Sequence, residues 1–584
     1  MWWTVGTLAV VVLLSLGWVG VRAFLAKNEL EAAVPLASQA QAQVMAHEVE
    51  AAVATSEKLA DHASRAAALM SDPVWRGMEV IPWAGDNLRG MRVLAAATDR
   101  VATGAVLPLA KASASLDLGA FAPVDGRIDL QPIIDLQEPV RAASAAFQQA
   151  DQMIATEHLD SADLIGPLAD ARDKFTGLLD EAAPLVTAVD KASQLLPAML
   201  GVDGPREILL LFQNNAELRS TGGIPGALAL LRTEGGAFQL AQQASTSDFP
   251  RFDPTVVNLP TETLALWGEN TARYIQDVTF SPEFSIGASV AREMWARQFG
   301  TAPASVIAVD PVALSYLLRA TGPVDLPTGE QLTADNAVQL LLSDVYFRYS
   351  DPAEQDAFFA SAAAAVFTAV SNGGIDPRAV IEALAEAGDE RRILIWNADP
   401  EEQAILAGTT LAGGLPVSAD GEQAFGVYLN DMTMSKMDPY LDVQIATGSL
   451  VCRRDGLPEY AIDVTLTNTA PGDAATSLPA YVTGGGQRYE PGVIATSVHV
   501  YSAPRTFNLG VTQGGERAAY HPTSDAGYTL SKVTAELAPG ESTSWRFSFL
   551  GDVAETRTPV IQSTPMIYKN EVSGLALSCD SSVE

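Results

Sequence analysis

The feature that most constrains the fold is an uncharged apolar run at the N-terminus. Residues 2–21 read WWTVGTLAVVVLLSLGWVGV and contain no charged side chain. An α-helix rises about 1.5 Å per residue, so about twenty residues cross the ~30 Å hydrocarbon core of a bilayer. No basic region precedes the run and no A-x-A-like cleavage site follows it, which favours a retained anchor over a cleaved signal peptide. We therefore expect residues 1–27 to be a transmembrane anchor.

The flanking charges and the cysteines point to opposite membrane orientations. Arg22 and Lys27 follow the run, and by the positive-inside rule they would place the bulk of the chain in the cytoplasm. The chain has two cysteines, Cys452 and Cys579, in one β-rich region, a pattern typical of an exported domain with a single disulfide. Two buried free thiols are the alternative. We give the cysteines more weight and predict a single-pass cell-membrane protein with its bulk extracytoplasmic.

The composition indicates a large, acidic, multidomain chain. At 584 residues it is long enough for about three or four domains, and 48% of its residues are hydrophobic, which is ample for real cores. The formal net charge of −34 would repel phosphate backbones, so no nucleic-acid partner is expected.

Residues 28–200 are predicted to form an α-helical bundle or stalk. The segment is rich in Ala, Gln, Glu and Asp, with few β-branched runs, and Leu30–Leu69 is predicted to be one long helix. Further along, apolar residues alternate at spacings of four and three, which places them on one helical stripe. We expect this stripe to pack within the chain, the alternative being a partner-binding face. Its members are Leu164, Leu168, Ala171, Phe175, Leu178, Ala182, Leu185, Val189, Ala192 and Leu196.

Two further regions follow, and the pattern changes between them. Residues 201–419 alternate strands with helices, which predicts an α/β (α+β) domain. Its expected strands are Glu207–Phe212, Ala227–Arg232, Phe238–Ser245, Val306–Val309 and Arg391–Trp396; its expected helices are Ser285–Phe299, one opening at Asp310-Pro311, Thr333–Tyr346 and Pro352–Val370. In residues 420–584 the period becomes two, as in YAIDVTLTN, VIATSVHVY and STSWRFSFL. This predicts a C-terminal antiparallel β-sandwich of immunoglobulin-like type.

The turn between the first two strands of the central region has groups suited to an anionic ligand. It contains Asn214, Asn215, Glu217, Arg219, Thr221, Gly222 and Gly223. A guanidinium matches phosphate oxygens, and glycines allow a ligand to approach the backbone N–H groups closely. The alternative is a well-satisfied corner, in which the asparagines bond local backbone and the glycines supply positive φ.

The sequence limits the chemistry that the central region can perform. It contains no zinc motif, Walker lysine, H-E-x-x-H or EF-hand loop. All five histidines lie outside residues 201–419, which excludes a Ser/His/Asp triad there. Catalysis would have to rest on carboxylates, arginines and a divalent metal.

Five motifs resemble a bacterial domain family of unknown function, family 4012. They are LLLFQNNAELRSTGGIPG, SDFP (Ser247–Pro250), VIAVDPVALSYLLRATGPVDL, LTADNAVQLLLSDVY and GVYLNDMTMSKMDPYL, and they occur in this order from about Leu200 to Leu441. The resemblance implies a single-span envelope protein with an N-terminal helical region. It implies no particular activity.

The same plan of elements is distantly similar to the LytR-CpsA-Psr phosphotransferases, which transfer glycans from a polyprenyl pyrophosphate carrier onto the cell wall. That similarity implies that Arg219 and Arg348 bind pyrophosphate. It also makes Glu217, Asp248 and Asp310 candidates for a catalytic base or for holding a divalent metal such as Mg. The paired arginines of that family are reduced here to Arg348 alone, in SDVYFRYSD.

Two hypotheses of function follow. In the first, which we favour, a membrane-anchored cell-envelope protein binds a lipid-linked glycan or other pyrophosphate-bearing ligand such as a cell-wall polymer precursor, and whether it also transfers this ligand is left open. It predicts an apolar tunnel with Arg219 and Arg348 at its mouth. In the second, the chain is a non-catalytic structural or scaffolding protein of the envelope. It predicts a filled interior in which Arg219 pairs inward with Glu217.

Overall fold

The chain folds into two compact units that do not follow one another simply in sequence. The computed structural model describes residues 2–46, 48–82, 84–115, 118–157, 164–373, 375–419 and 421–579. The first unit comprises Met1–Ala120 and Asp129–Ala198, and the second comprises Phe121–Ile128 and Met199–Glu584. The short segment Phe121–Ile128 therefore belongs to the second unit although helices of the first unit flank it.

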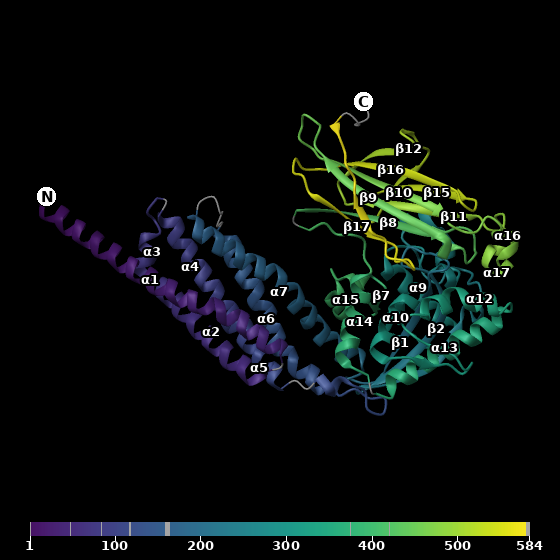
Figure 1. Cartoon of the computed structure of the whole chain (residues 1–584), viewed down its shortest axis with the longest axis horizontal. Coiled ribbons are helices and arrows are strands. Elements are labelled where there is room, and N and C mark those ends of the chain that lie inside the picture. The colour runs from purple at the N-terminus through teal and green to yellow at the C-terminus, as the bar shows by residue number, and fades with distance from the viewer. Residues whose placement is uncertain are drawn as a thin grey trace. The chain divides into compact units, whose positions relative to one another are not determined.

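The first unit is helical, as predicted (Figure 1). Its α-helices are α1 (Trp2–Met45), α2 (Val49–Met70), α3 (Pro73–Met78), α4 (Ala84–Val101), α5 (Leu107–Ser115), α6 (Gln131–Thr156) and α7 (Gly166–Met199). The prediction of one helix over Leu30–Leu69 is wrong, because α1 ends at Met45 and α2 begins at Val49. The fold-back buries Ala33 of α1 against Leu59 and Ala63 of α2, which a continuous helix would leave facing water.

The predicted stripe on α7 divides between core and surface. Leu168, Phe175 and Ala182 pack against a core that includes Leu179 and residues of α4 and α6. Leu178 and Leu185 are 63% and 68% exposed. The expectation that the whole stripe packs within the chain is therefore only partly right, since α7 turns one edge of it outward.

One helical stretch among the described residues, Ala84–Ala114, is long and apolar enough to cross a membrane. It comprises α4, a π-helical turn (Ala102–Val106) and most of α5. Its apolar side chains are used within the bundle, where Val93 and Leu94 share a core with Ala143 and Phe147 of α6. A core helix passes the same test of length and composition.

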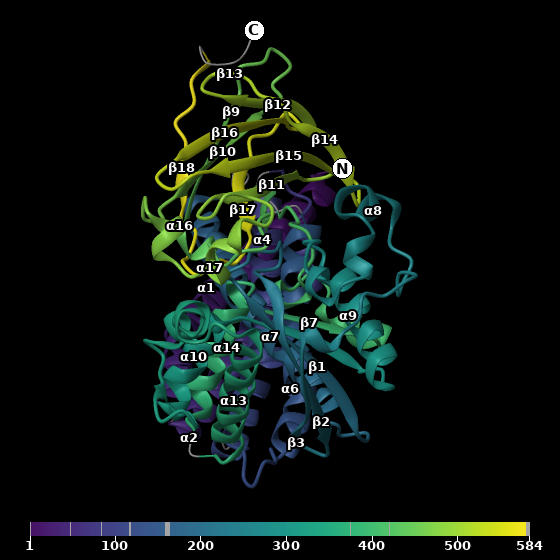
Figure 2. The ribbon, with the colours of Figure 1, turned by 90° about the vertical axis from the view of Figure 1, so that its right-hand side faces the viewer.

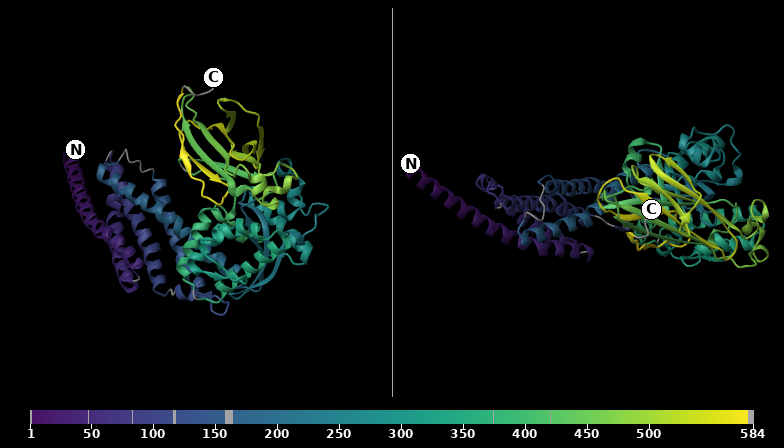
Figure 3. Two further views of the ribbon diagram at one scale, coloured as in Figure 1. Left: turned by 45° about the vertical axis from the view of Figure 1, so that its right-hand side comes forward. Right: turned by 90° about the horizontal axis from the view of Figure 1, so that it is seen from above.

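The predicted anchor, residues 2–21, forms the first part of α1. The side chains of residues 2–9 and 11 lie outside the described part of the chain. From Val19 onward α1 packs on α2, α3 and α4 through Ala26, Met70 and Trp75. Before that point Leu13, Leu14 and Trp18 are 67%, 69% and 51% exposed. Figures 1 and 3 show this end of α1 extending away from the other helices of its unit.

The second unit contains the five-stranded α/β sheet. Its strands β1 (Arg206–Asn214), β2 (Ile224–Glu234), β3 (Ala237–Ser245), β4 (Ser305–Val309) and β7 (Ile393–Asn397) lie in the order β3-β2-β1-β4-β7. Only β1 and β4 pair in parallel. Alternate residues of β1 face opposite sides of the sheet. Leu209 and Leu211 share a core with residues of α9 (Phe284–Phe299), whereas Phe212 lines a cavity with residues of α13 (Pro352–Ser371). Figure 2 shows α9 and α13 on opposite sides of the sheet. The predicted strands of this region are confirmed, as are the predicted helices except Thr333–Tyr346, where α11 (Ala337–Gln339), a π-helical turn (Leu340–Asp344) and α12 (Val345–Arg348) follow one another.

The segment Phe121–Ile128 continues this sheet beyond β3. Arg127 forms a β-bridge with Ala237. The Phe238 N–H donates to the Gly126 carbonyl (3.0 Å) and the Ile128 N–H donates to the Gly236 carbonyl (2.9 Å). This segment therefore gives the first residues of the edge strand β3 a partner.

The C-terminal region is β-rich, as predicted, and holds two sheets (Figure 3). The longer strands are β8 (Glu422–Asp431), β9 (Leu441–Leu450), β10 (Glu459–Asn468), β11 (Ile494–Ser502), β12 (Phe507–Gln513), β15 (Tyr528–Leu537) and β16 (Ser542–Leu550); the shorter ones are β13 (Glu516–Arg517), β14 (His521–Asp525), β17 (Thr558–Ser563) and β18 (Val572–Gly574). The sheet orders are β13-β12-β16-β10-β9-β18 and β14-β15-β11-β8-β17. Trp545, Phe547 and Phe549 enter one core with residues of both sheets.

The pairing is not purely antiparallel, which corrects the prediction. β17 pairs in parallel with β8, and β18 pairs in parallel with β9. Parallel pairing needs a long connection, and the chain between β8 and β17 supplies one. The assignment to an immunoglobulin-like sandwich stays a prediction. The Sγ atoms of Cys452 and Cys579 lie 2.04 Å apart, at disulfide distance, next to the β9–β18 pair.

A cysteine substitution tests this bond. Because the bond closes a loop spanning a sequence separation of 127, its loss is expected to cost about 2 to 5 kcal/mol. Cys452→Ser should lower the melting temperature measured by circular dichroism without reductant. Dithiothreitol should lower it for the wild type and leave it unchanged for Cys452→Ser/Cys579→Ser. A wild type insensitive to reductant, with unfolding exposing both thiols, would contradict the pairing.

Candidate functional site

The turn between β1 and β2 is held in a single conformation by its glycines. Gly222 has φ +133°, a conformation that side chains other than glycine rarely adopt. A Cβ atom on Gly223 would lie 2.3 Å from the Asn214 carbonyl oxygen. The two glycines therefore allow the chain to fold tightly back on the end of β1, and they bring the polar side chains of residues 214–221 into the interior.

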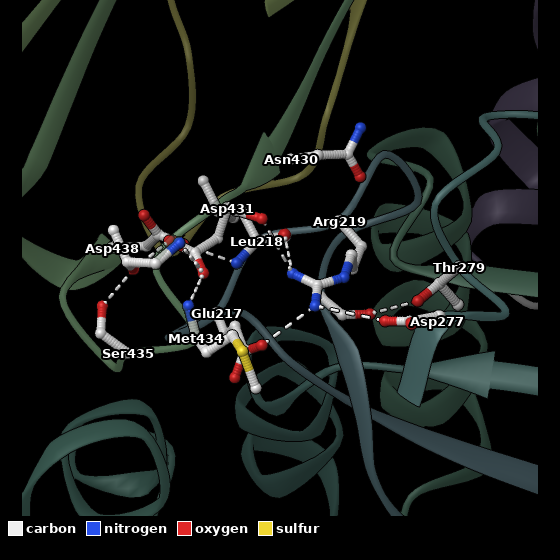
Figure 4. Close-up of polar contacts among 12 residues, drawn as sticks. Glu217, Leu218, Arg219, Asp277, Thr279, Asn430, Asp431, Met434, Ser435 and Asp438 are labelled. Carbon is white, nitrogen blue, oxygen red and sulfur yellow. Dashed lines mark hydrogen bonds and ion pairs between the residues drawn. The ribbon is translucent and has the colours of Figure 1, made fainter. Parts of the chain in front are cut away.

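Arg219 is sealed inside the protein (Figure 4). Its side chain is 5% exposed, and its Nη2 lies 3.0 Å from Glu217 Oε1 and 3.7 Å from Asp277 Oδ1. Nη1 donates to the Leu218 carbonyl at 2.9 Å, and the guanidinium carbon lies 4.5 Å from the centre of the Phe280 ring. Burial would lower the pKa of Arg219, but Glu217, Asp277 and Asp431 raise it. The expectation of a guanidinium at the mouth of a cleft is wrong.

Glu217 also contacts a second cation, which comes from the loop after β8. Lys436 Nζ lies 2.5 Å from Glu217 Oε2, and both side chains are nearly inaccessible. Burial raises the pKa of Glu217, but Lys436 and Arg219 together bring it below its ordinary value. Burial lowers the pKa of Lys436, yet Glu217 raises it above its ordinary value. All three groups are therefore charged at neutral pH.

Two more carboxylates complete this group. Asp438 Oδ2 accepts from the Leu218 N–H at 2.6 Å, and Asp431 Oδ2 accepts from the Met434 N–H at 2.8 Å. Burial, followed by the charge of Glu217, raises the pKa of Asp431 to about 6, and burial and Asp431 raise that of Asp438 well above its ordinary value. We call this group the ionic cluster: Glu217, Arg219, Asp277, Asp431, Lys436 and Asp438.

The ionic cluster has more carboxylates than cations. Two cations, Arg219 and Lys436, serve four carboxyl groups, so at least one carboxyl is best accommodated as the neutral acid. Within the residues that the structure describes, no group of His, Cys, Asp or Glu is arranged to hold a metal ion. The arrangement is suited to joining two parts of the chain and to binding a proton.

A second buried contact ties the same turn to three other elements. Asn215 Nδ2 donates to Asp310 Oδ2 (3.1 Å), to the Gly222 carbonyl (3.3 Å) and to the Pro565 carbonyl (3.2 Å). Asp310 caps α10 (Pro311–Thr321) and lies 2.8 Å from Arg392 Nη1. Arg392 Nη2 in turn donates to the Met566 carbonyl at 2.8 Å. Burial raises the pKa of Asp310, and Arg392 opposes this rise.

The part of the chain that contains the turn is similar to a known protein family. Residues 203–346 match the family model described as protein of unknown function DUF4012. Searches of curated proteins and of solved structures give no match. The DUF4012 segment supplies Glu217, Arg219 and Asp277, whereas Asp431 and Lys436 lie beyond its end. The resemblance to the LytR-CpsA-Psr enzymes stays a prediction.

The other predicted site residues of the DUF4012 segment are divided between the turn and the surface. Asn214 Nδ2 donates to the Tyr346 hydroxyl, and Thr221 accepts from Gln213 Nε2 at 3.0 Å. These contacts are buried and local. Arg348, just past the segment, lies on the surface and pairs with Glu330 at 2.7 Å. The expected meeting of Arg219 and Arg348 at one site is therefore wrong.

Asp248 also lies apart from the turn. It closes a capping box after β3, where its Oδ2 accepts from the Ser245 N–H at 2.8 Å. It lines a cavity beside α13 that no residue of the turn lines. Two of the three carboxylates predicted as base or metal ligands, Glu217 and Asp310, form buried ion pairs. The third, Asp248, lines the separate cavity beside α13.

Sequence reasoning missed the partners of the turn. Asp431, Lys436 and Asp438 all lie in the motif GVYLNDMTMSKMDPYL, whose resemblance to the same family as the turn was the available signal for an interaction between them. Asp277 and Phe280 lie outside the five motifs. Their role depends on how the segment after α8 (Thr261–Trp267) packs on the turn, which no local pattern reveals.

Removing the buried guanidinium should destabilise the protein strongly. Arg219→Ala leaves Glu217 and Asp277 with less cationic compensation in the interior, and breaking a buried pair in this way typically costs 3 to 5 kcal/mol. The measurement is the urea midpoint of the second unit's unfolding, followed by tryptophan fluorescence. Arg348→Ala, which breaks a surface pair, is the control and should cost under about 1 kcal/mol. Similar effects of the two substitutions would refute the structural role of Arg219.

Asp431 predicts a particular pH dependence. Its pKa rises on folding from 3.8 to about 6, so its contribution to stability is present below about pH 4 and is lost as the pH rises through about 6. Asp431→Asn removes the ionisable group, so the variant does not lose this stability as the pH rises. Relative to the wild type, the variant should gain on the order of 2 to 3 kcal/mol of stability between pH 4 and pH 7. Parallel stability curves for the two proteins over this range would exclude the elevated pKa.

Proposed function

We propose that this protein is a membrane-tethered, non-catalytic structural component of the cell envelope, in which the DUF4012 turn is an internal junction. The observation that carries the proposal is the enclosure of Arg219 by Glu217, Asp277, the Leu218 carbonyl and Phe280. Both terminal nitrogens of the guanidinium contact the protein's own groups, and its Nε is buried. This matches the arrangement that the scaffolding hypothesis predicts.

The exposed start of α1 supports the membrane tether. Packing of α1 on its own bundle begins at Val19, and Arg22 Nε lies 3.1 Å from Asp72 Oδ2. Leu13, Leu14 and Trp18 precede this point and face outward. Side chains of this kind exposed along a helix are unfavourable in water and favourable in lipid. In this proposal α1 enters the bilayer at about Trp18, and the helical bundle sets the reach from the membrane.

The cysteine pair supports an extracytoplasmic location for the second unit. A disulfide persists in oxidising compartments and is rare in the cytosol, and the Sγ atoms of Cys452 and Cys579 lie at bonding distance. The net charge of −34 is compatible with a soluble unit held beyond the membrane surface. The C-terminal sheets are then the parts available to other envelope components.

Cell fractionation tests the tether. The full chain should stay in the membrane fraction after a carbonate wash, and deletion of residues 2–21 should release it to the soluble fraction. Leu13→Asp/Leu14→Asp, which charges the exposed side of α1, should release it as well, whereas Leu178→Asp/Leu185→Asp on α7 should not. In cells treated with a thiol-blocking reagent, Cys452 and Cys579 should be recovered oxidised. Release of the untouched chain, or reduced thiols, would overturn the proposal.

The lipid-linked glycan hypothesis is the competing proposal, and it makes a distinct prediction. Polyprenyl pyrophosphate should bind the full chain in native mass spectrometry, and Arg348→Ala, which leaves the interior intact, should weaken that binding. Under the scaffolding proposal no such adduct is expected. A specific adduct lost in Arg348→Ala would restore the first hypothesis with Arg348 rather than Arg219 as the anion-binding group.

A further inference from the structure

A cavity of about 240 Å³ lies between the α/β sheet and α13. It belongs neither to the turn nor to the ionic cluster. Strands β1, β2 and β3 form one wall and α13 forms the other. The lining residues are Phe212, Ala227, Leu228, Gln243, Ala244, Ser245, Asp248, Asp356, Ala357, Phe359, Ala360 and Ala363. The volume equals about eight groups of the size of a water molecule or a methylene, taking ~30 Å³ for each.

The cavity exists because α13 presents alanines where a core helix would present larger side chains. Ala357, Ala360 and Ala363 recur every third residue and lie on the same side of the helix. Ala227 lies on the same face of the sheet as Phe212 and faces them, and Phe212 and Phe359 supply aromatic wall. The part of the cavity between these residues is therefore apolar.

The polar side chains that line the cavity are Gln243, which donates to the Ala360 carbonyl at 2.9 Å, and two carboxylates that share one serine. Ser245 Oγ donates to Asp356 Oδ2 at 2.6 Å, and the Ser245 N–H donates to Asp248 Oδ2 at 2.8 Å. Each carboxylate keeps a second oxygen that these bonds do not use. Among the described residues neither Asp248 nor Asp356 forms an ion pair, although most arginines of the second unit do. Asp248 is exposed and Asp356 is half-buried, so two carboxylates without an ion pair lie at the solvent side of an apolar space.

We propose that this cavity binds a small cationic amphiphile, an alkylammonium group whose apolar chain lies against Ala360 and whose nitrogen lies between Asp248 and Asp356. An ammonium supplies the missing positive charge and donates to the free carboxylate oxygens. The aromatic ring of Phe359 adds a favourable surface for a cation and its methylenes. An anionic ligand is disfavoured here by the same two carboxylates. The site is independent of the structural role proposed above.

Binding of n-hexylammonium to the full chain tests the site. The chain is placed in phosphatidylcholine nanodiscs without detergent, and binding is followed by saturation-transfer difference NMR, with hexanol and hexanoate as uncharged and anionic probes. The wild type should bind hexylammonium at least about tenfold more tightly than either probe. Equal binding of the three probes would show that charge is not recognised and would overturn the proposal.

Three variants locate the binding within the molecule. Asp356→Asn retains an oxygen that accepts from Ser245 and removes the charge, so it should weaken hexylammonium binding at least about tenfold. Ala360→Phe should abolish binding by filling the cavity. Glu354→Gln, which removes an exposed carboxylate on the same helix, is the matched control and should bind like the wild type. Unchanged binding in Asp356→Asn, verified to be folded by circular dichroism, would place the ligand elsewhere and overturn the assignment.

Discussion

The burial of a guanidinium and an ammonium beside shared carboxylates is the constraint on which the second unit depends. Removing a charge from water costs several kcal/mol even after the protein relaxes around it, and only close opposite charges and hydrogen bonds offset that cost. Arg219 pairs with Glu217 within the turn, but Asp277 reaches it only when a later segment packs on the turn, and Glu217 is completed by Lys436, 219 residues downstream. These ion pairs therefore link the α/β sheet to the segment that follows β8.

The same arrangement explains why the turn is polar although it is buried. Asp438 accepts from the Leu218 N–H and Asp310 accepts from Asn215 Nδ2, so directional hydrogen bonds specify the position of the turn. A position specified in this way is consistent with a protein whose central task is to hold its parts in a fixed arrangement. The excess of carboxyl groups makes that arrangement depend on protons.

Much of the fold could be predicted from the sequence, because its signals are local. The alternation in STSWRFSFL placed Trp545, Phe547 and Phe549 on one buried face, and Asp310-Pro311 marked the start of α10. Contacts between segments that are far apart in the sequence have no such local pattern. The parallel strands β17 and β18, the break after Met45 and the docking of Phe121–Ile128 each depend on surfaces that the chain assembles only after folding. The prediction of the binding site failed for a related reason. The sequence shows that Arg219 and Glu217 are present, but it does not show whether their side chains face a ligand or each other.

The placement of Phe121–Ile128 has a practical consequence for anyone who divides this chain. The polypeptide passes between the two units at residues 120–121, 128–129 and 198–199, so no single cut separates them cleanly. A fragment begun at Met199 would discard the neighbour of Ala237 and bare the hydrogen-bonding edge of β3. An unpaired edge strand can form backbone hydrogen bonds with a strand of another molecule. Self-association of such a fragment would then result from the loss of the eight-residue segment Phe121–Ile128 and would not be evidence for a native oligomer.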